Sequence, residues 1–346
     1  MRLKAGLQIL QKVVTNYADD ATRLISKKGD DVIKAVFTSS DDVSRGRKIA
    51  KDFFKKQCVR EREIASAIDF SDFEIGFEKI KFRKAESLED AQKFAQQELG
   101  ISRFDFTDLE MANQFNLSTT RAFNKTGCRD FIPEEVVMDK LSGIKSLTKE
   151  DLASIPAATL QLKGGKQRVV FSTDFLNQID DILDKNIDYF AKLGQISKND
   201  RGIEQINLIC DYRYSHTLNR YFKLYKEGKL SKKAKLDFFT LLNVAKDEQR
   251  MLLSRQRRAV GMDALVLHEE GHVFHSKVTG NQHTSLLQYA NPKENELIQR
   301  EISTYAGENP GEMVGEKFAE TLSGAKYSEE VENVFEKYVG KQIPNI

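Results

Sequence analysis

The chain has 346 residues, of which 40% are hydrophobic and 31% charged, a balance typical of a folded protein rather than a disordered one. Its length allows two or three domains with a sizeable core. The net charge of +2 does not require a nucleic-acid partner, and no apolar run approaches the length of a transmembrane helix.

The N-terminus also lacks the long apolar run of a signal peptide. The three cysteines are widely spaced and form no C-x-x-C pattern, which predicts free thiols in a reducing compartment (Cys58, Cys128 and Cys210). We therefore expect a protein of a host cytoplasm, or one that leaves the cell packaged in a virion.

Residues 1–68 predict amphipathic helices, because apolar side chains recur at helical spacing in this segment (Leu3, Leu7, Leu10 and Val14; Ile49, Phe53 and Phe54). Such an arm must bury its apolar face. Packing against the body of the protein is the favoured use, and an oligomer or capsid interface is the alternative.

The next segment predicts strands and then helices. Residues 69–85 alternate apolar and charged side chains, which is typical of one or two strands. A helix is predicted to begin after Ser87, a favourable N-cap residue, and to end at Gly100. A further helix is predicted over residues 109–123.

Residues 158–162 and 168–171 flank Lys163-Gly164-Gly165-Lys166, a pattern that predicts a β-hairpin. Ser172 or Thr173 begins the following helix, and residues 186–250 predict mostly helix. Tyr221 and Tyr225, four positions apart, are typical of packing. The basic runs at 232–235 and 255–258 are typical of solvated helix faces.

His268-Glu269-Glu270-Gly271-His272 is the most informative stretch, in a chain with only five histidines. Residues i and i+4 share one helix face, so the two imidazoles can bind one Zn²⁺. Glu269 can reach a water on that metal and take its proton. The residues flanking the motif are apolar, which predicts a buried helix (Val266, Leu267, Val273 and Phe274). Buried histidines need partners, and a metal ion is one such partner.

His275 falls on the same face one turn later. It is interpreted as a substrate contact or a polar residue at the helix end, with a role beside the metal ligands as the alternative. A catalytic zinc site usually has three protein ligands, and His283 lies in a polar loop. A carboxylate from a downstream helix is the better candidate for the third ligand.

Residues 310–322 predict that helix, with Asn309 as N-cap and Pro310 at the first position. Glu312, Glu316 and Glu320 form a stripe with a spacing of four. A stripe of like charges suits either a solvated face or the neighbourhood of a cation. Capping alone would also explain Glu312.

These residues resemble the signature of anthrax-lethal-factor-like zincin metallopeptidases, in which a tyrosine precedes the glutamate ligand by seven positions. The resemblance covers roughly residues 260–324 and is carried by Ile302-Ser303-Thr304-Tyr305-Ala306, Asn309-Pro310, Glu312 and Glu316-Lys317-Phe318-Ala319-Glu320. Similar domains occur in phage minor head proteins and in bacterial toxins. Residues 77–116 also resemble a segment that precedes such domains in phage head-morphogenesis proteins.

The resemblance implies that His268, His272 and Glu312 bind zinc, with Glu269 as general base on the zinc water. It further implies that Tyr305 donates a hydrogen bond to the developing oxyanion or leaving group.

The resemblance also implies that Glu316 orients a ligand histidine. The chain departs from the family at Met313-Val314, where aromatics are usual, and at Gly315, where alanine is usual. These departures leave Glu316 open as an alternative third ligand.

The predicted fold class is α+β, with a mostly helical N-terminal region before a zincin-like metallopeptidase domain whose small sheet lies beside the H-E-x-x-H helix. The predicted domains are a helical arm at 1–68, an α/β connecting domain at 69–150 and the zincin-like domain at 151–346.

The predicted function is zinc-dependent hydrolysis of a peptide bond in a protein or peptide substrate, in a phage virion or a toxin. The alternative is a structural phage minor head or capsid-associated protein whose zincin domain is ancillary or inactive. Phage capsid or portal proteins are candidate partners, whereas a membrane is not expected and nucleic acid is the weakest candidate.

Overall fold

The computed structural model describes residues 78–141, 154–208, 214–251, 258–280 and 288–340. The chain divides into two compact units, Met1–Gly76 and Phe77–Ile346, and every described residue lies in the second. The predicted arm at 1–68 therefore lies outside the described residues, as do Cys58, Cys210 and His283.

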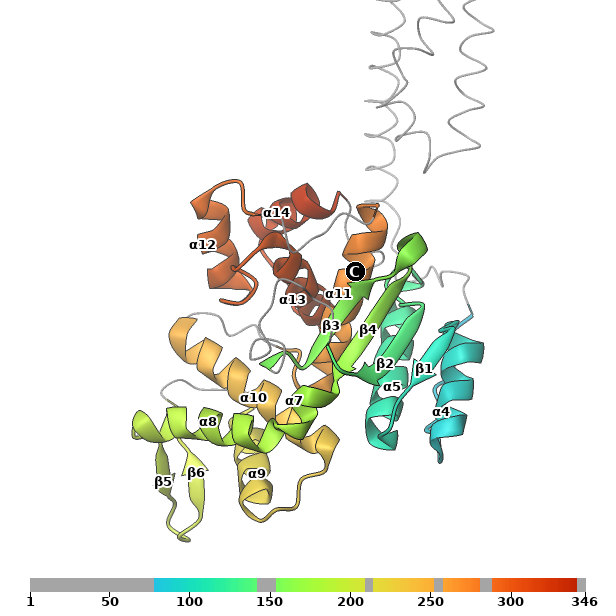
Figure 1. The fold of residues 1–346 in the computed structure, drawn as a ribbon. Coiled ribbons are helices and arrows are strands. Elements are labelled where there is room, and N and C mark those ends of the chain that lie inside the picture. The colour runs from blue at the N-terminus through green and yellow to red at the C-terminus, as the bar shows by residue number, and fades with distance from the viewer. Residues whose placement is uncertain (1–77, 142–153, 209–213, 252–257, 281–287, 341–346) are drawn as a thin grey trace, which may run out of the picture. The chain divides into compact units, whose positions relative to one another are not determined.

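A four-stranded sheet runs through the second unit (Figure 1). Its strands are β1 (Arg103–Asp105), β2 (Glu135–Asp139), β3 (Ala157–Gln161) and β4 (Gln167–Ser172), in the spatial order β1-β2-β4-β3. β2 pairs in parallel with β1 and β4, whereas β3 pairs antiparallel with β4. The predicted hairpin is confirmed, and its turn uses the positive φ of Gly164 and Gly165.

Helices make up most of the remaining described structure, with a two-stranded ribbon of β5 (Ile196–Lys198) and β6 (Glu204–Ile206). The helices are α4 (Leu88–Phe94), α5 (Leu109–Thr126), α7 (Thr173–Asn177), α8 (Ile179–Lys192), α9 (Ser215–Lys226), α10 (Lys232–Met251), α11 (Gly261–Val278), α12 (Pro292–Glu301), α13 (Pro310–Leu322) and α14 (Glu329–Val339). None of the helices in the described ranges is long and apolar enough to cross a bilayer. The protein is thus mixed α+β, mostly helical with a small sheet, as predicted.

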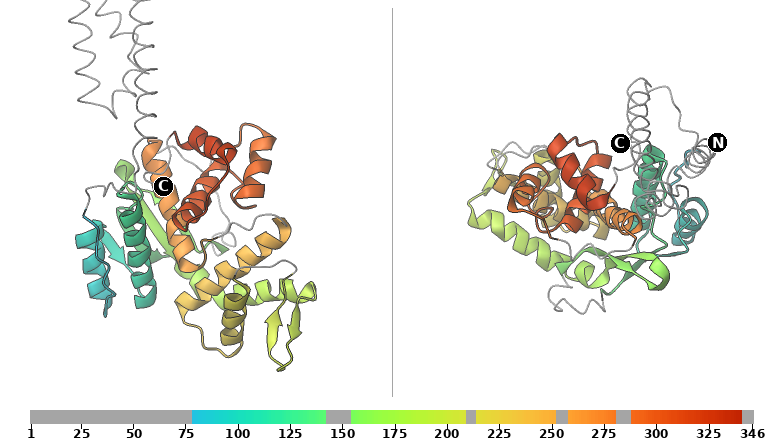
Figure 2. Two further views of the ribbon diagram at one scale, coloured as in Figure 1. Left: turned by 180° about the vertical axis from the view of Figure 1, so that it is seen from behind. Right: turned by 90° about the horizontal axis from the view of Figure 1, so that it is seen from above.

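Helices α5 and α11 cover one face of the sheet (Figure 2). Aromatic side chains fill the space between α5 and the strands (Phe104, Phe106, Phe115 and Phe171). Val137 and Val170 pack on the opposite face, with Ala158 and Leu160 of β3 against them. Because side chains alternate along a strand, Thr159 points to the face that α11 covers.

The predicted helix after Ser87 is confirmed. The Ser87 side chain accepts a hydrogen bond from the amide of Asp90. The helix then widens to a π-helical turn at Ala95–Leu99 and ends at Gly100, whose φ is 78°.

The strand prediction for residues 69–85 is wrong in its described part, because residues 78–85 form no strand. Their backbone is paired with side chains of α5 instead. Asn124 bonds the amide and carbonyl of Ile80, and Asn113 bonds those of Ala85. The alternating apolar residues thus reflect an extended segment lying on a helix rather than a sheet ladder.

The larger hydrophobic core contains residues from both sides of the predicted boundary at residue 150, for example Phe115 and Phe274. Phe131 likewise packs against Phe318, with 5.5 Å between ring centroids. Residues 77–346 therefore form one compact unit around a shared core.

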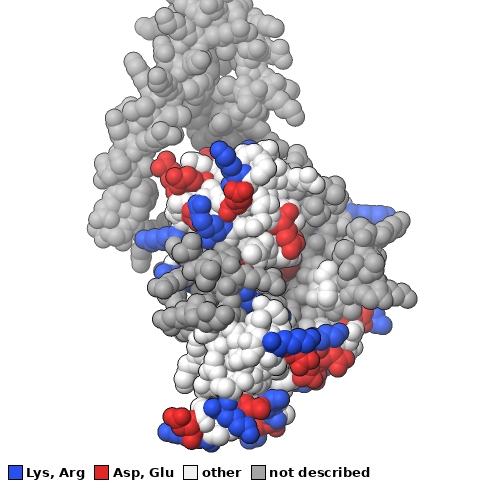
Figure 3. All heavy atoms as spheres, turned by 90° about the vertical axis from the view of Figure 1, so that its left-hand side faces the viewer, with Lys and Arg blue, Asp and Glu red and all other residues white. Residues whose placement is uncertain are grey.

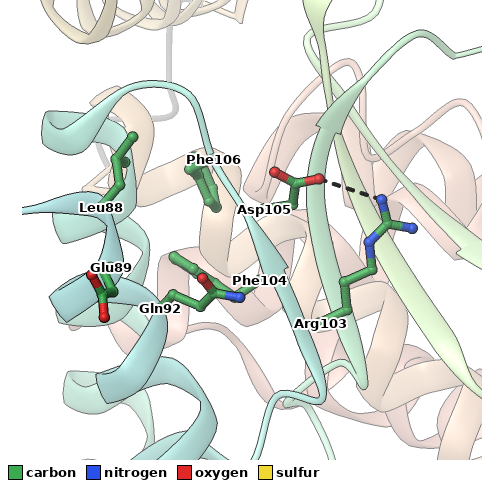
Figure 4. Close-up of a pocket in the computed structure, with 7 residues that line it drawn as sticks. All are labelled: Leu88, Glu89, Gln92, Arg103, Phe104, Asp105 and Phe106. Carbon is green, nitrogen blue, oxygen red and sulfur yellow. Dashed lines mark hydrogen bonds and ion pairs between the residues drawn. The ribbon is translucent and has the colours of Figure 1, made fainter.

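The two edges of the sheet face different surroundings. At the β1 edge a shallow hollow lies between α4 and β1, where Phe104 and Phe106 turn toward the helix (Figure 4). Arg103 and Asp105 turn away and pair with each other at 3.3 Å. The β3 edge instead lies beside α11.

Candidate metal centre

Helix α11 carries the H-E-x-x-H residues, and α10 fixes where it begins. The amide of Gly261 donates to Thr240 Oγ1 and that of Met262 to Asp237 Oδ1, both at 2.7 Å. Gly261 has a φ of 75°, and a Cβ there would lie 2.8 Å from Asp237 Oδ1. Asp237 therefore caps a helix start that requires glycine.

Two glycines bring α13 close to α11. A Cβ on Gly271 would lie 2.8 Å from the Cα of Gly315, and a Cβ on Gly315 would lie 2.8 Å from the His268 ring. A side chain at either position would push the helices apart. Gly315, where the resembled family usually has alanine, is thus explained by its contact with a histidine of the motif.

Three candidate ligand atoms converge where these helices cross. His268 Nε2 lies 3.0 Å from His272 Nε2 and 3.2 Å from Glu312 Oε2, and His272 Nε2 lies 3.5 Å from the same carboxylate oxygen. These three residues form a group that could hold a metal ion.

The donor set fits a small tetrahedral ion. Metal–ligand bonds of about 2.0–2.1 Å at tetrahedral angles place ligand atoms roughly 3.3 Å apart. Oε2 of Glu312 is buried and receives no well-directed hydrogen bond from any described residue. Buried lone pairs that face one another without a proton or cation between them are costly, so the arrangement suits a bound cation.

The charges of the group are strongly coupled. Burial opposes ionisation of Glu312, but His272 and His268 outweigh it and hold the pKa of that carboxyl well below its usual range. Burial likewise opposes charging of His268, but Glu312 and Glu316 raise the pKa of this imidazole well above its usual value. The site thus favours a negative carboxylate beside positive charge, which a metal ion can supply in place of protons.

Glu316 contacts the other nitrogen of His268. Its Oε1 lies 3.2 Å from His268 Nδ1, and its Oε2 accepts a 3.0 Å hydrogen bond from Ser303, which is fully buried. An Nδ1–H donated to Glu316 leaves the Nε2 lone pair free for a metal.

Glu320, the third member of the stripe, lies away from the histidines. Its carboxylate accepts hydrogen bonds from the amides of Arg258 and Ala259 at 2.6 and 3.3 Å. The stripe is therefore neither a solvated face nor wholly a cation site, because Glu320 holds the segment that leads into α11.

Tyr305 stacks on His268, with ring centroids 5.9 Å apart. Partial burial and the Glu312 carboxylate raise the pKa of Tyr305 far above its ordinary value, so the hydroxyl keeps its proton. Asp247 of α10 holds the preceding residue, since it accepts bonds from the amide and hydroxyl of Thr304. The sequence alone did not identify Asp247.

Glu269 is buried beside the sheet, and Thr159 of β3 donates a 2.8 Å hydrogen bond to its Oε2. The neighbouring Glu270 points elsewhere, to α5, where Thr119 donates to its Oε1 at 2.5 Å. Burial raises the pKa of Glu270 well above its usual range. The two glutamates of the motif therefore contact different elements, Glu269 the sheet and Glu270 helix α5, because successive helical residues point about 100° apart.

His275, interpreted as a substrate contact or a polar residue at the helix end, lies in the last turn of α11, as the second interpretation expects. This residue is fully buried, and its Nε2 lies 3.3 Å from the carbonyl oxygen of Tyr338 in α14. Burial lowers its pKa to about 4. His275 therefore belongs to the packing of α11 against α14 rather than to the surface.

Comparison with known proteins gives no significant match to any protein family, to any curated protein or to any solved structure. The resemblance of residues 260–324 to zincin metallopeptidases therefore stays a prediction from their motifs.

Proposed function

We propose that the protein is a zinc metallopeptidase in which His268, His272 and Glu312 bind the metal. The observation that carries this proposal is the convergence of their three ligand atoms at 3.0–3.5 Å, with Glu269 next to the first histidine. A bound zinc ion would supply a Lewis acid and lower the pKa of its water towards 7.

The chain's own residues would then carry the protons. Glu269 accepts the proton of the attacking water and later delivers it to the leaving amine. Tyr305 donates its hydroxyl hydrogen bond to the oxyanion that develops on the peptide carbonyl. Glu316 keeps His268 in the tautomer whose Nε2 can bind metal, and Ser303 holds Glu316.

The position of β3 at the edge of the sheet, as far as the described strands go, supports an extended peptide as the substrate. The bonds Leu162 N–H to Lys166 O (2.8 Å) and Ser172 N–H to Pro156 O (2.9 Å) mark the hydrogen-bonded pairs with β4. These pairs alternate along an antiparallel ladder, so the backbone groups of Thr159 face away from β4. A substrate strand could pair there, next to Glu269.

The mixed charge on one face of the described structure favours a protein substrate over a polyanion. On the face in Figure 3, Lys and Arg side chains are interleaved with Asp and Glu rather than gathered into one basic surface. A phage virion, with capsid or portal proteins as partners, is the setting that the resemblance suggests.

The test compares zinc content and peptide cleavage in the wild-type protein, Glu269→Gln and His268→Ala. We expect about one zinc per chain in the wild type and in Glu269→Gln, and loss of zinc in His268→Ala. Cleavage of a mixed peptide library should fall at least about a hundredfold in Glu269→Gln. The exposed Glu296→Gln on α12 is the matched control and should cleave normally.

Wild-type cleavage by Glu269→Gln would contradict the mechanism. One zinc per chain without cleavage of any peptide would favour the alternative, a structural particle protein with an inactive site.

A further inference from the structure

Thr159, on the edge strand β3, contacts Glu269, the proposed general base, from 110 positions away in the sequence. Its Oγ1 lies 2.8 Å from Glu269 Oε2 and 3.1 Å from the Glu269 carbonyl oxygen. Ala158 and Leu160, its neighbours in β3, pack on the opposite face of the sheet. The hydroxyl is therefore presented to α11 by the strand register itself, in which Thr159 lies opposite Val169.

Thr159 is also a hydrogen-bond donor to the carboxylate of Glu269. Among the described residues, no Lys or Arg forms an ion pair with Glu269. Glu269 is only 4% exposed, so a carboxylate with free rotation would lose its solvation without gaining a fixed partner. One donor on Oε2 leaves Oε1 to meet the proton of a water.

We infer that Thr159 is a positioning residue for Glu269, an inference that rests on the proposed peptidase function. Its hydroxyl fixes the plane of the carboxylate, whereas its backbone faces the open edge of the sheet. Removing the hydroxyl should therefore impair proton transfer without disturbing a substrate paired along β3. The effect should appear in kcat rather than in KM.

The test uses the full-length, zinc-loaded protein and a peptide that the wild type cleaves. Thr159→Val removes the hydroxyl and keeps the β-branched shape, and kcat should fall about tenfold to a hundredfold, the usual effect of losing one charge-assisted hydrogen bond. KM should change less than about threefold, and zinc content should not change. Thr159→Ser, which keeps the hydroxyl, should restore kcat to within about threefold of wild type.

Leu160→Ala is the control for a loosened strand, because Leu160 packs on the other face of the sheet. It should keep kcat within about threefold of wild type. A Thr159→Val enzyme within about twofold of wild-type kcat would overturn the inference, as would a Thr159→Ser enzyme as slow as Thr159→Val.

A second measurement separates this inference from the proposed function. In metal-free protein, Thr159→Val should lower the unfolding midpoint in the wild-type background but not in Glu269→Ala, because the two side chains are coupled. Coupling without any peptidase activity would reject the function and keep the contact. An equal fall in both backgrounds would reject the contact.

Discussion

Glu312, Glu316 and Glu320 share one face of α13, but each carboxylate contacts a different set of atoms. Each step of four residues turns the helix by about 40°, so the side chains fan out rather than align. Glu312 reaches the two Nε2 atoms, Glu316 reaches His268 Nδ1 and Glu320 reaches the amides before α11. Helix α13 thus supplies a candidate metal ligand (Glu312), a carboxylate that contacts His268 (Glu316) and one that binds the backbone before α11 (Glu320).

Glu316→Gln should weaken zinc binding about tenfold to a hundredfold, because an amide holds the Nδ1–H of His268 less strongly than a carboxylate. Competition for zinc against a chelating dye measures the change. Glu320→Gln is the matched control on the same helix, and it should affect stability rather than zinc affinity. Equal zinc affinity in Glu316→Gln and wild type would show that this contact does not tune the metal.

The sequence predicted the residues of the site that lie within short, regular spacings. His268 and His272 are four apart, and Glu312 follows a capping signal at Asn309 that the structure bears out with a 3.0 Å bond. Thr159 and Asp247 could not be predicted, because they meet Glu269 and Thr304 across 110 and 57 positions.

At the scale of elements, the crossing of α11 and α13 depends on Gly271 and Gly315. These glycines let the two helices approach closely, so that the His268 ring lies against the backbone of α13 at Gly315. Glu312 and Glu316 lie on the same helix, next to this contact. The geometry of the site is thus set by helix packing before any metal binds.

Gly271→Ala should destabilise the metal-free protein by about 1–2 kcal/mol. Alanine gains up to about 1 kcal/mol of helix propensity, but a Cβ 2.8 Å from the Gly315 backbone forces an overpacking cost of about 1–3 kcal/mol. Urea unfolding followed by circular dichroism measures this, since the chain has no tryptophan. A more stable variant would show that the helices can separate freely.

Gly315→Ala offers the informative comparison. Its Cβ meets the His268 ring rather than backbone, so zinc affinity should fall together with stability. If only stability falls, the ring has moved without harm to the ligand geometry.

Element types followed from local signals, whereas strand order did not. The helix at 310–322 has its cap and proline at the expected positions, and the hairpin has its glycines. β1 is three residues long and pairs with β2 about 30 positions away, so no local pattern marks it. Residues 78–85 have a strand-like pattern, but the backbone amides of Ile80 and Ala85 donate hydrogen bonds to asparagine side chains of α5 instead of to another strand.

At the scale of the whole molecule, His275 ties stability to pH. Its pKa is about 4 in the folded protein and about 6.5 in an unfolded chain. Between these values the unfolded chain binds a proton that the folded protein does not. The contribution of His275 is therefore complete above pH 6.5 and declines as pH falls, by up to about 3 kcal/mol near pH 4.

His275→Gln removes this titration, and its stability deficit should be largest at pH 7 and shrink toward pH 4.5. Urea unfolding of both proteins in a chelator, at each pH, gives the difference. All other ionisable groups are common to the two proteins, so their contributions largely cancel in the difference. A deficit that is the same at every pH would contradict a buried, neutral His275.

If zinc binds as proposed, its removal should lower the stability of the entire unit, because the candidate ligands lie on α11 and α13, which pack against each other. An ion that binds only the folded state stabilises it by about 2.7 kcal/mol at a hundredfold excess over Kd. For a unit of this size that corresponds to a fall in Tm of roughly 5–10 °C when a chelator is added. His268→Ala should unfold at a lower temperature than loaded wild type and show no further change with chelator. If the chelator lowers Tm equally in both proteins, the stabilising metal is bound elsewhere, and the histidines and Glu312 are held together by protons instead.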